Sequence, residues 1–276
     1  MEKHDCIHWK GKKLTATVHY PDSPVGKERS KRPVVVICHG FTSNRIGVDR
    51  LFVKTAQHLS KNQFVVIRFD YAGCGESEGN YGEHCFKDLI DQTHAAVSFA
   101  LQLPGIDPDQ ITLLGHSLGG AVAVHSADRD ERVKRLILWS AVGKPFEDIV
   151  KIIGQEEYSN LFIKGYVDHL GYSLTTTFMQ SLKKFHPLDQ LSRFTGDVLL
   201  VHGTDDKDIS AHYCSEFFEK TRKRACGNSN IHLIKGANHT FSSIPHFNKL
   251  IAATTAWLTK SSSPLKVPGT LTSISS

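Results

Sequence analysis

The sequence lacks any run of about 18 uninterrupted apolar residues, so it predicts no membrane-spanning helix. Its first residues, Met1 to Lys13, are charged and contain no apolar stretch of signal-peptide length, and we therefore expect a cytoplasmic protein. The six cysteines include no Cys-x-x-Cys pair, which argues against a zinc site or a redox motif and favours free thiols. The chain also has no internal repeat.

Charge of one sign is not concentrated in any segment. The formal net charge is +5, but Lys and Arg are spread along the chain and mixed with acids, so we expect no nucleic-acid partner. Hydrophobic residues make up 40% of the 276 positions and charged residues 22%, which are ordinary values for a folded chain with a sizeable core. The composition leaves the oligomeric state open.

The sequence does contain short β-branched apolar runs that are separated by longer stretches with helical spacing. Continuous apolar strands that alternate with helices are typical of a mostly parallel sheet covered on both faces, so we expect an α/β, doubly wound fold. Two further short strands around Gly11 precede these runs, between Cys6 and Tyr20. The runs are Val34 to Cys38, Phe64 to Phe69, Ile111 to Leu114, Leu136 to Trp139, Val198 to Val201 and Ile231 to Ile234.

One interval between strands is much longer than the others. The stretch between Trp139 and Val198 exceeds what a single crossover needs. From about residue 143 to 187, apolar residues recur in it at roughly helical spacing, which predicts a helical cap insertion over the sheet edge. We therefore expect one domain over residues 1–260 that carries this cap. The Ser/Pro/Thr-rich residues 261–276 are predicted to form a disordered tail.

A G-x-S-x-G pattern from Gly115 to Gly119 follows an apolar strand directly and precedes a run of small residues. Hydrolases place a nucleophilic serine on such a tight strand-to-helix turn, because the hydroxyl needs a neighbouring base and free backbone N–H groups. The pattern alone is weak evidence, since Gly75 to Gly79 matches it as well. However, Ser77 follows a polar loop, and the glutamates on either side would repel a developing oxyanion. Ser117 is therefore the predicted nucleophile, and Ser77 is interpreted as loop structure.

An activated serine requires a histidine that is oriented by an acid, and in one large group of α/β enzymes the chain order is Ser, acid, His. The acid should follow a buried strand, where Asp205, Asp206 and Asp208 come after Val198 to Val201. Any of these three could instead cap the next helix. The base should follow the final strand, and His239 fits this position best among the 16 histidines.

At these positions the chain resembles the α/β-hydrolase family, and in particular its small esterases and lipases, such as feruloyl (cinnamoyl) esterases and monoacylglycerol lipases. The resemblance extends from Cys6 to about Thr259. The family's His-Gly-x-x-Asp segment matches His202 to Asp206, which implies Asp206 as the acid. Its Gly-x-x-His segment matches Gly236 to His239.

Two more family segments are present. The His-Gly loop after the first parallel strand matches His39 and Gly40, and the resemblance implies that the backbone N–H groups of Phe41 and Leu118 form the oxyanion hole. The Arg-x-Asp-x-x-Gly-x-Gly-x-Ser segment matches the chain from Arg68 to Ser77 and assigns that serine to the loop.

The resemblance implies a serine hydrolase for carboxylic esters, of short-to-medium acyl or feruloyl type, with a catalytic triad of Ser117, Asp206 and His239. No cofactor and no metal ion are implied. A thioesterase, an acyltransferase, an amidase or a peptidase could use the same triad. Outside enzymes, the same fold also serves ligand-binding receptors, so this alternative stays open as well.

Overall fold

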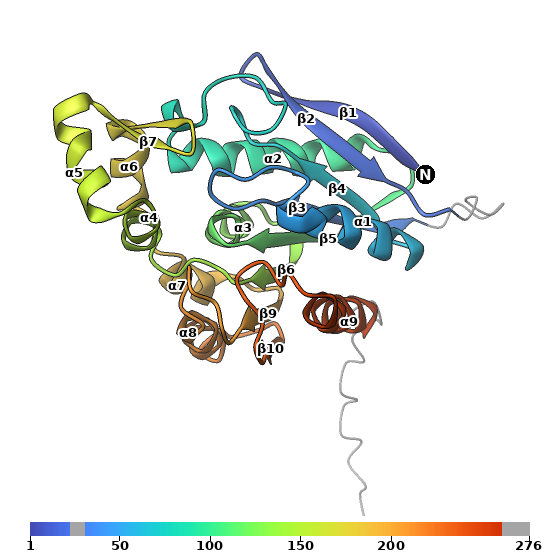
Figure 1. Ribbon diagram of the computed structural model, residues 1–276. Coiled ribbons are helices and arrows are strands. Elements are labelled where there is room, and N and C mark those ends of the chain that lie inside the picture. The colour runs from blue at the N-terminus through green and yellow to red at the C-terminus, as the bar shows by residue number, and fades with distance from the viewer. Residues whose placement is uncertain (23–30, 261–276) are drawn as a thin grey trace, which may run out of the picture.

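An eight-stranded sheet forms the centre of the protein (Figure 1). The computed structural model describes residues 1–22 and 31–260. The strands of the sheet are β1 (Glu2–Trp9), β2 (Lys12–His19), β3 (Arg32–Cys38), β4 (Val65–Phe69), β5 (Ile106–His116), β6 (Val133–Trp139), β9 (Asp197–Gly203) and β10 (Ser229–Ile234). Their spatial order is β1-β2-β4-β3-β5-β6-β9-β10, in which β1, β2 and β4 pair antiparallel and all other neighbours are parallel.

Helices cover both faces of this sheet, because the side chains of its central strands alternate between two apolar cores. Val34 and Val36 belong to one core, and Val35 and Ile37 to the other. The first core contains side chains of α2 (Phe86–Gln102), α3 (Leu118–Asp128) and α8 (His212–Thr221), and the second contains those of α1 (Leu51–Lys61) and α9 (Ile244–Lys260). The predicted doubly wound, mostly parallel α/β fold is confirmed.

Each predicted strand is present, most with wider bounds than the apolar runs suggest. The strand expected at Ile111 to Leu114, for example, spans Ile106–His116. The short helices outside the two layers are η1 (Val48–Arg50), η2 (Tyr81–Glu83), α7 (Pro187–Gln190) and η3 (Leu191–Arg193). Among the helices in residues 1–22 and 31–260, none is long and apolar enough to cross a membrane. The tail predicted for residues 261–276 lies outside the described residues.

The cap insertion differs from the prediction, because it is only partly helical. It contains α4 (Pro145–Ile153), α5 (Gln155–Lys164) and α6 (Thr176–Leu182), but also an antiparallel hairpin of β7 (Tyr166–His169) and β8 (Tyr172–Thr175). The helical interpretation of the insertion is therefore wrong for Tyr166–His169 and Tyr172–Thr175. Gly165, with φ of 79°, ends α5, and beyond it the burial alternates with period two, so that Val167 and Leu174 pair and point inward.

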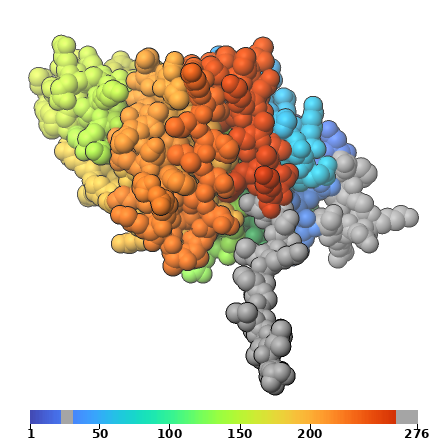
Figure 2. Space-filling model, turned by 90° about the horizontal axis from the view of Figure 1, so that it is seen from below, coloured from blue at the N-terminus to red at the C-terminus, as the bar shows by residue number. Residues whose placement is uncertain are grey.

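The hairpin of the cap is anchored on the loop that follows β4. A β carbon at Gly82 would lie 1.9 Å from the carbonyl oxygen of Ser173, so the two backbones touch. The Thr175 hydroxyl also donates a hydrogen bond of 2.6 Å to the Gly82 carbonyl oxygen. The cap forms the yellow-green lobe at one end of the molecule in Figure 2. Its hairpin is thereby held over the C-terminal end of the sheet, where the predicted site residues lie.

Candidate active site

Ser117 lies on the turn that joins β5 to α3, with backbone angles of φ 57° and ψ −125°. A positive φ is rarely adopted by a residue with a side chain and costs free energy, which the surrounding structure must supply. Here the Ser117 N–H donates to the Trp139 carbonyl oxygen over 3.0 Å, and the Ser117 carbonyl oxygen accepts the N–H groups of Gly120 and Val142 at 2.9 and 3.1 Å. These bonds hold the strained turn in place.

Both glycines of the pentapeptide are required by close backbone contacts. A β carbon at Gly115 would lie 2.4 Å from the Gly119 carbonyl oxygen. One at Gly119 would lie 2.2 Å from the carbonyl oxygen of Cys38, at the end of β3. The first turn of α3 therefore packs directly on the segment that leaves β3. This contact brings the serine turn and the His39–Phe41 loop together.

Asp206 and His239 come together from two loops at the same edge of the sheet. His239 Nδ1 lies 2.8 Å from Asp206 Oδ2 and donates its proton, because an ionised carboxylate only accepts. Oδ1 accepts the N–H groups of Asp208 and Ile209 at 3.0 and 2.9 Å. Burial by itself would raise the pKa of the Asp206 carboxyl, but the hydrogen bonds from His202, His239 and the backbone outweigh it and lower the pKa well below the usual range.

The other two aspartates do not take this position. Asp205 Oδ1 instead accepts the Thr204 hydroxyl at 2.9 Å. Asp208 is exposed, and no hydrogen bond joins its side chain to His239 within residues 1–22 and 31–260. Neither caps α8, which begins after Ala211 without a side-chain cap. Of the three candidates, Asp206 is the one bonded to the histidine.

His239 is placed beside Ser117 through His116, the residue that precedes the serine. His116 Nε2 donates to the carbonyl oxygen of His239 over 2.9 Å, and the two rings lie 4.7 Å apart between centroids. Burial, followed by repulsion from His239, lowers the pKa of His116 to about 3, so this ring is neutral. Within the described residues no hydrogen bond joins Ser117 Oγ to His239. Such bonds are often long in the absence of substrate.

Asp206, Asp208 and His239 are also a group whose side-chain ligand atoms lie within 4.8 Å of one another, as metal ligands can. Each Asp206 oxygen already accepts two hydrogen bonds, and His239 Nδ1 is one of the donors. A cation would have to displace these bonds. The arrangement therefore favours acid–base chemistry over metal binding at this position.

The loop of His39, Gly40 and Phe41 lies against the serine. A β carbon at Gly40 would be 3.0 Å from Ser117 Cβ and 3.4 Å from Ser117 Oγ. The Gly40 carbonyl oxygen accepts from His39 Nδ1 at 2.9 Å and from the Ser43 N–H at 3.3 Å. Because a trans peptide points its C=O and N–H in opposite directions, the Phe41 N–H is turned away from these partners.

Among the described residues, no hydrogen-bond acceptor is found for the backbone N–H groups of Phe41 and Leu118, which lie on the two segments that meet at Ser117. Leu118 is the first residue of α3, whose N–H has no carbonyl to bind within the helix and lies at the positive end of the helix dipole. Unsatisfied donors beside a nucleophile can bind a developing oxyanion.

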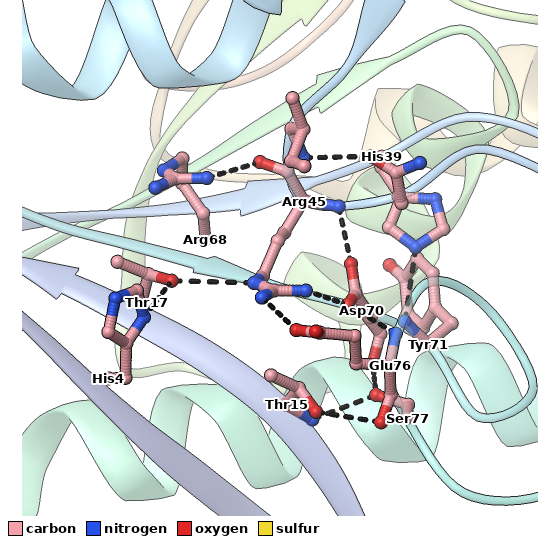
Figure 3. A network of polar contacts seen from close by, with 12 residues as sticks. His4, Thr15, Thr17, His39, Arg45, Arg68, Asp70, Tyr71, Glu76 and Ser77 are labelled. Carbon is pink, nitrogen blue, oxygen red and sulfur yellow. Dashed lines mark hydrogen bonds and ion pairs between the residues drawn. The ribbon is translucent and has the colours of Figure 1, made fainter.

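A buried polar network holds this loop from behind (Figure 3). His39 Nε2 accepts the Tyr71 N–H at 3.1 Å, so the ring is the neutral tautomer that carries its proton on Nδ1. Arg45 donates from its side chain and its backbone N–H to Asp70, whose side chain is fully buried. Arg68 donates to the carbonyl oxygen of Arg45 over 2.7 Å. The loop after β3 is thus tied to the end of β4 at two points.

Ser77, the serine of the second G-x-S-x-G pattern, belongs to the same network (Figure 3). Its hydroxyl donates to the Asp70 carbonyl oxygen over 2.7 Å and accepts the Thr15 N–H over 2.8 Å. Both bonding directions of the hydroxyl are therefore used. This supports the interpretation of Ser77 as loop structure.

Aromatic side chains of the cap lie over the same loop. The Phe41 ring stacks on His169 of the hairpin, with centroids 5.1 Å apart and planes inclined by 27°. It also stacks on Phe178 of α6 at 6.0 Å. The insertion therefore packs on the loop that lies against Ser117.

Sequence reasoning did not foresee the contacts of three histidines, His39, His116 and His202. His39 and His116 stand next to functional turns, and their bonds to Tyr71 and His239 cross between segments far apart in the chain. His202 is part of the matched His-Gly-x-x-Asp segment, and its Nε2 lies 3.0 Å from Asp206 Oδ2. Only the matched motif indicates a role for this ring. The spacing of residues in the sequence does not tell whether a side chain at the end of a strand contacts the loop that follows.

Comparison with known proteins identifies the family and supports the fold. The family model described as "Serine aminopeptidase, S33" matches residues 29–167, just over half of the chain. The chain belongs to this family of α/β-hydrolases. Its fold also matches the solved structure of Est1E from Butyrivibrio proteoclasticus with bound ferulic acid, with a TM-score of 0.79 and 23% identity over 93% of this chain and 98% of that one.

Curated relatives of this α/β-hydrolase align with only part of the chain. The thiohydrolase aneE of Aspergillus aculeatus is 36% identical over 106 residues, which cover 38% of this chain and 32% of the relative. The human protein ABHD12B is 28% identical over 206 residues, or 70% of this chain and 51% of the relative. The chain therefore spans only about a third to a half of the length of these relatives.

Proposed function

We propose that the protein is a serine hydrolase that cleaves carboxylic esters through an acyl-enzyme on Ser117. The arrangement at the end of β5 carries this proposal: a serine with φ 57° on a strand-to-helix turn, beside a histidine that is bonded over 2.8 Å to a buried aspartate. A strained turn of this kind persists only where the surrounding bonds enforce it, and such strain is concentrated at functional sites. Membership in the family gives independent support.

In the proposed reaction, Ser117 Oγ attacks the carbonyl carbon of the ester while its proton passes to His239 Nε2. Asp206 holds the ring by Nδ1 and stabilises the imidazolium. The C–O bond to the alcohol then breaks, and the alcohol leaves with the proton from Nε2. Water repeats the sequence in reverse roles: it attacks the acyl carbon, loses its proton to Nε2, and Ser117 Oγ departs as the hydroxyl.

The negative oxygen of each tetrahedral intermediate is bound by the N–H groups of Phe41 and Leu118. The contact of Gly40 with Ser117 supports this role, because it sets the Phe41 peptide next to the nucleophile. Preorganised N–H donors of this kind stabilise the transition state more than the ground state, and each contributes roughly 10²–10³ in rate.

The cap bears on the choice of substrate. Phe41, on the loop beside Ser117, stacks on His169 of the cap, and partly exposed aromatic side chains at this place suit a planar or apolar acyl group. The fold neighbour with bound ferulic acid points in the same direction. We therefore propose short-to-medium acyl esters or aromatic esters of feruloyl type as substrates.

A second candidate is thioester hydrolysis, which the thiohydrolase relative favours. The same triad would serve, since only the leaving group changes from an alcohol to a thiol. The family description as an aminopeptidase keeps peptides as a third class of substrate. These three substrate classes are ranked by measuring kcat/KM of the purified protein. The panel contains p-nitrophenyl esters of increasing acyl length, methyl ferulate, acyl thioesters and aminoacyl p-nitroanilides.

The proposed nucleophile is tested by Ser117→Ala. We expect esterase activity to fall by on the order of 10⁴ or more, and labelling by a fluorophosphonate probe to disappear. Ser77→Ala is the matched control, because it alters the serine of the same pattern elsewhere in the chain. Turnover of p-nitrophenyl acetate at the wild-type rate in folded Ser117→Ala would refute the assignment.

A further inference from the structure

The carboxylate of Asp206 accepts hydrogen bonds from two histidines at one oxygen. His239 Nδ1 lies 2.8 Å from Oδ2, and His202 Nε2 lies 3.0 Å from the same atom. The Asp206 and His202 side chains are 0% and 2% exposed, so water does not compete for these bonds. The proposed mechanism uses His239 and leaves the second histidine without a function.

The tautomer of His202 follows from its surroundings. Nε2 faces the Asp206 carboxylate and, at 3.2 Å, the carbonyl oxygen of Ile209. Both groups only accept hydrogen bonds, so Nε2 must carry a proton. The ring thus bridges the acid and the backbone of the loop that carries it, from the end of β9.

We propose that His202 is a positioning residue of the catalytic site, which fixes the orientation of the Asp206 carboxylate and keeps the transferred proton on His239. The inference rests on the proposed roles of Asp206 and His239. A second donor at Oδ2 draws electron density from the oxygen that faces His239. The carboxylate then orients and stabilises the imidazolium without taking its proton, and Nε2 of His239 can return that proton to the leaving alcohol.

Two other titratable groups lie close to Asp206 and His239 and contribute to the electrostatic potential there. His116 approaches His239 from the end of β5, with ring centroids 4.7 Å apart. The Asp208 carboxylate lies within 4.8 Å of the ligand atoms of Asp206 and His239. His202 differs from both, because it donates directly to the carboxylate oxygen that His239 binds.

The test compares three replacements of His202. Gln carries an amide N–H the same number of bonds from the main chain as Nε2, Phe has a ring without a donor, and the amide of Asn is one bond too short to reach. We expect His202→Phe to lower kcat by roughly ten- to hundredfold, the range that corresponds to one hydrogen bond to a charged group, with KM changed by less than about threefold. His202→Gln should recover most of the loss, and Asn should not.

The pH profile separates positioning from packing. Without the second donor, the carboxylate holds the His239 imidazolium more strongly, so the acid limb of kcat/KM should move to higher pH in His202→Phe and remain near wild type in His202→Gln. In the wild-type protein, ¹H–¹⁵N NMR of the histidine rings should show a protonated Nε2 at His202. This measurement requires no variant and decides the tautomer even where a replacement fails to fold.

Each outcome decides between the possibilities. Equal losses in folded Phe and Gln variants at every pH would mean that the ring only packs, and unchanged kinetics in folded Phe and Asn variants would show that it has no role, so either result overturns the proposal. An unprotonated Nε2 in the wild type also overturns it. Asp206→Asn is measured alongside: if that variant keeps full activity, the proposed function itself fails, whereas its inactivity with an indifferent His202 rejects the positioning role alone.

Discussion

His125 on α3 should make the stability of the protein depend on pH in a calculable way. The side chain is 4% exposed and packs against Phe86 and Phe185, with ring centroids 5.9 and 5.0 Å away. Within the described residues its Nε2 has no hydrogen-bond partner. Burial, followed by repulsion from Arg129, lowers the pKa of His125 to about 4.

The sign of the effect follows from the two pKa values. In the unfolded chain the imidazole takes up a proton as the pH falls below about 6.5, whereas the folded protein accepts it only near pH 4. The free energy of unfolding is therefore not reduced by His125 above pH 6.5, and it decreases as the pH falls from there to about 4. Between pH 8 and pH 5 this amounts to about 2 kcal/mol of the free energy of unfolding.

The variant His125→Phe removes the titrating group and keeps a ring in the same aromatic site. We expect its free energy of unfolding, relative to wild type, to rise by about 2 kcal/mol from pH 8 to pH 5, whatever the difference is at pH 8. Urea denaturation at both pH values measures this. His232→Phe, at an exposed position of β10, is the control and should show no such rise. A difference for His125→Phe that does not change with pH would refute the reasoning.

Two further predictions concern the serine turn and the loop behind it. In Gly40→Ala the new methyl group would lie 3.0 Å from Ser117 Cβ, so the loop must shift by a few tenths of an ångström. We expect kcat on p-nitrophenyl acetate to fall by roughly 10²-fold, with little change in Tm. Full activity of this variant would contradict an oxyanion role for the loop. Ser77→Ala loses the two hydrogen bonds of its hydroxyl, so we expect a loss of about 1–3 kcal/mol in urea denaturation and kcat/KM within about threefold of wild type. A large loss of kcat/KM with unchanged stability would contradict its structural role.

Much of the fold could be predicted because the local pattern and the tertiary structure agree. The apolar runs of the inner strands are continuous, since inner parallel strands are buried on both faces. Each predicted run coincides with a strand of the sheet to within one residue or lies inside it. The cap was predicted less well. A four-residue strand between two glycines does not establish a period that distinguishes it from helix, so the apolar spacing predicts helix where the hairpin lies.

In the candidate site, too, some residues could be predicted from the sequence and others could not. The sequence predicted Ser117, His239 and the glycines of the turn from their positions after strands, because strand-to-helix turns impose local requirements on residue type. Asp206 was implied by the family motif. The sequence could not choose among the three aspartates by chemistry, since Asp205 and Asp208 lie within two residues and carry the same group. The tertiary structure separates them, because one carboxylate accepts the His239 proton at 2.8 Å.

What the sequence by itself determined about this protein is the fold class, the serine turn and the family, all of which depend on local periodicity and on glycines at fixed positions. Only the tertiary structure decided that His116 holds the His239 loop, that Arg45 and Asp70 brace the loop after β3, and that His202 and His239 share one carboxylate oxygen of Asp206. These contacts join residues of different segments, and their geometry depends on how strands pair and loops pack. A directional hydrogen bond between distant segments leaves no periodic signal in the chain.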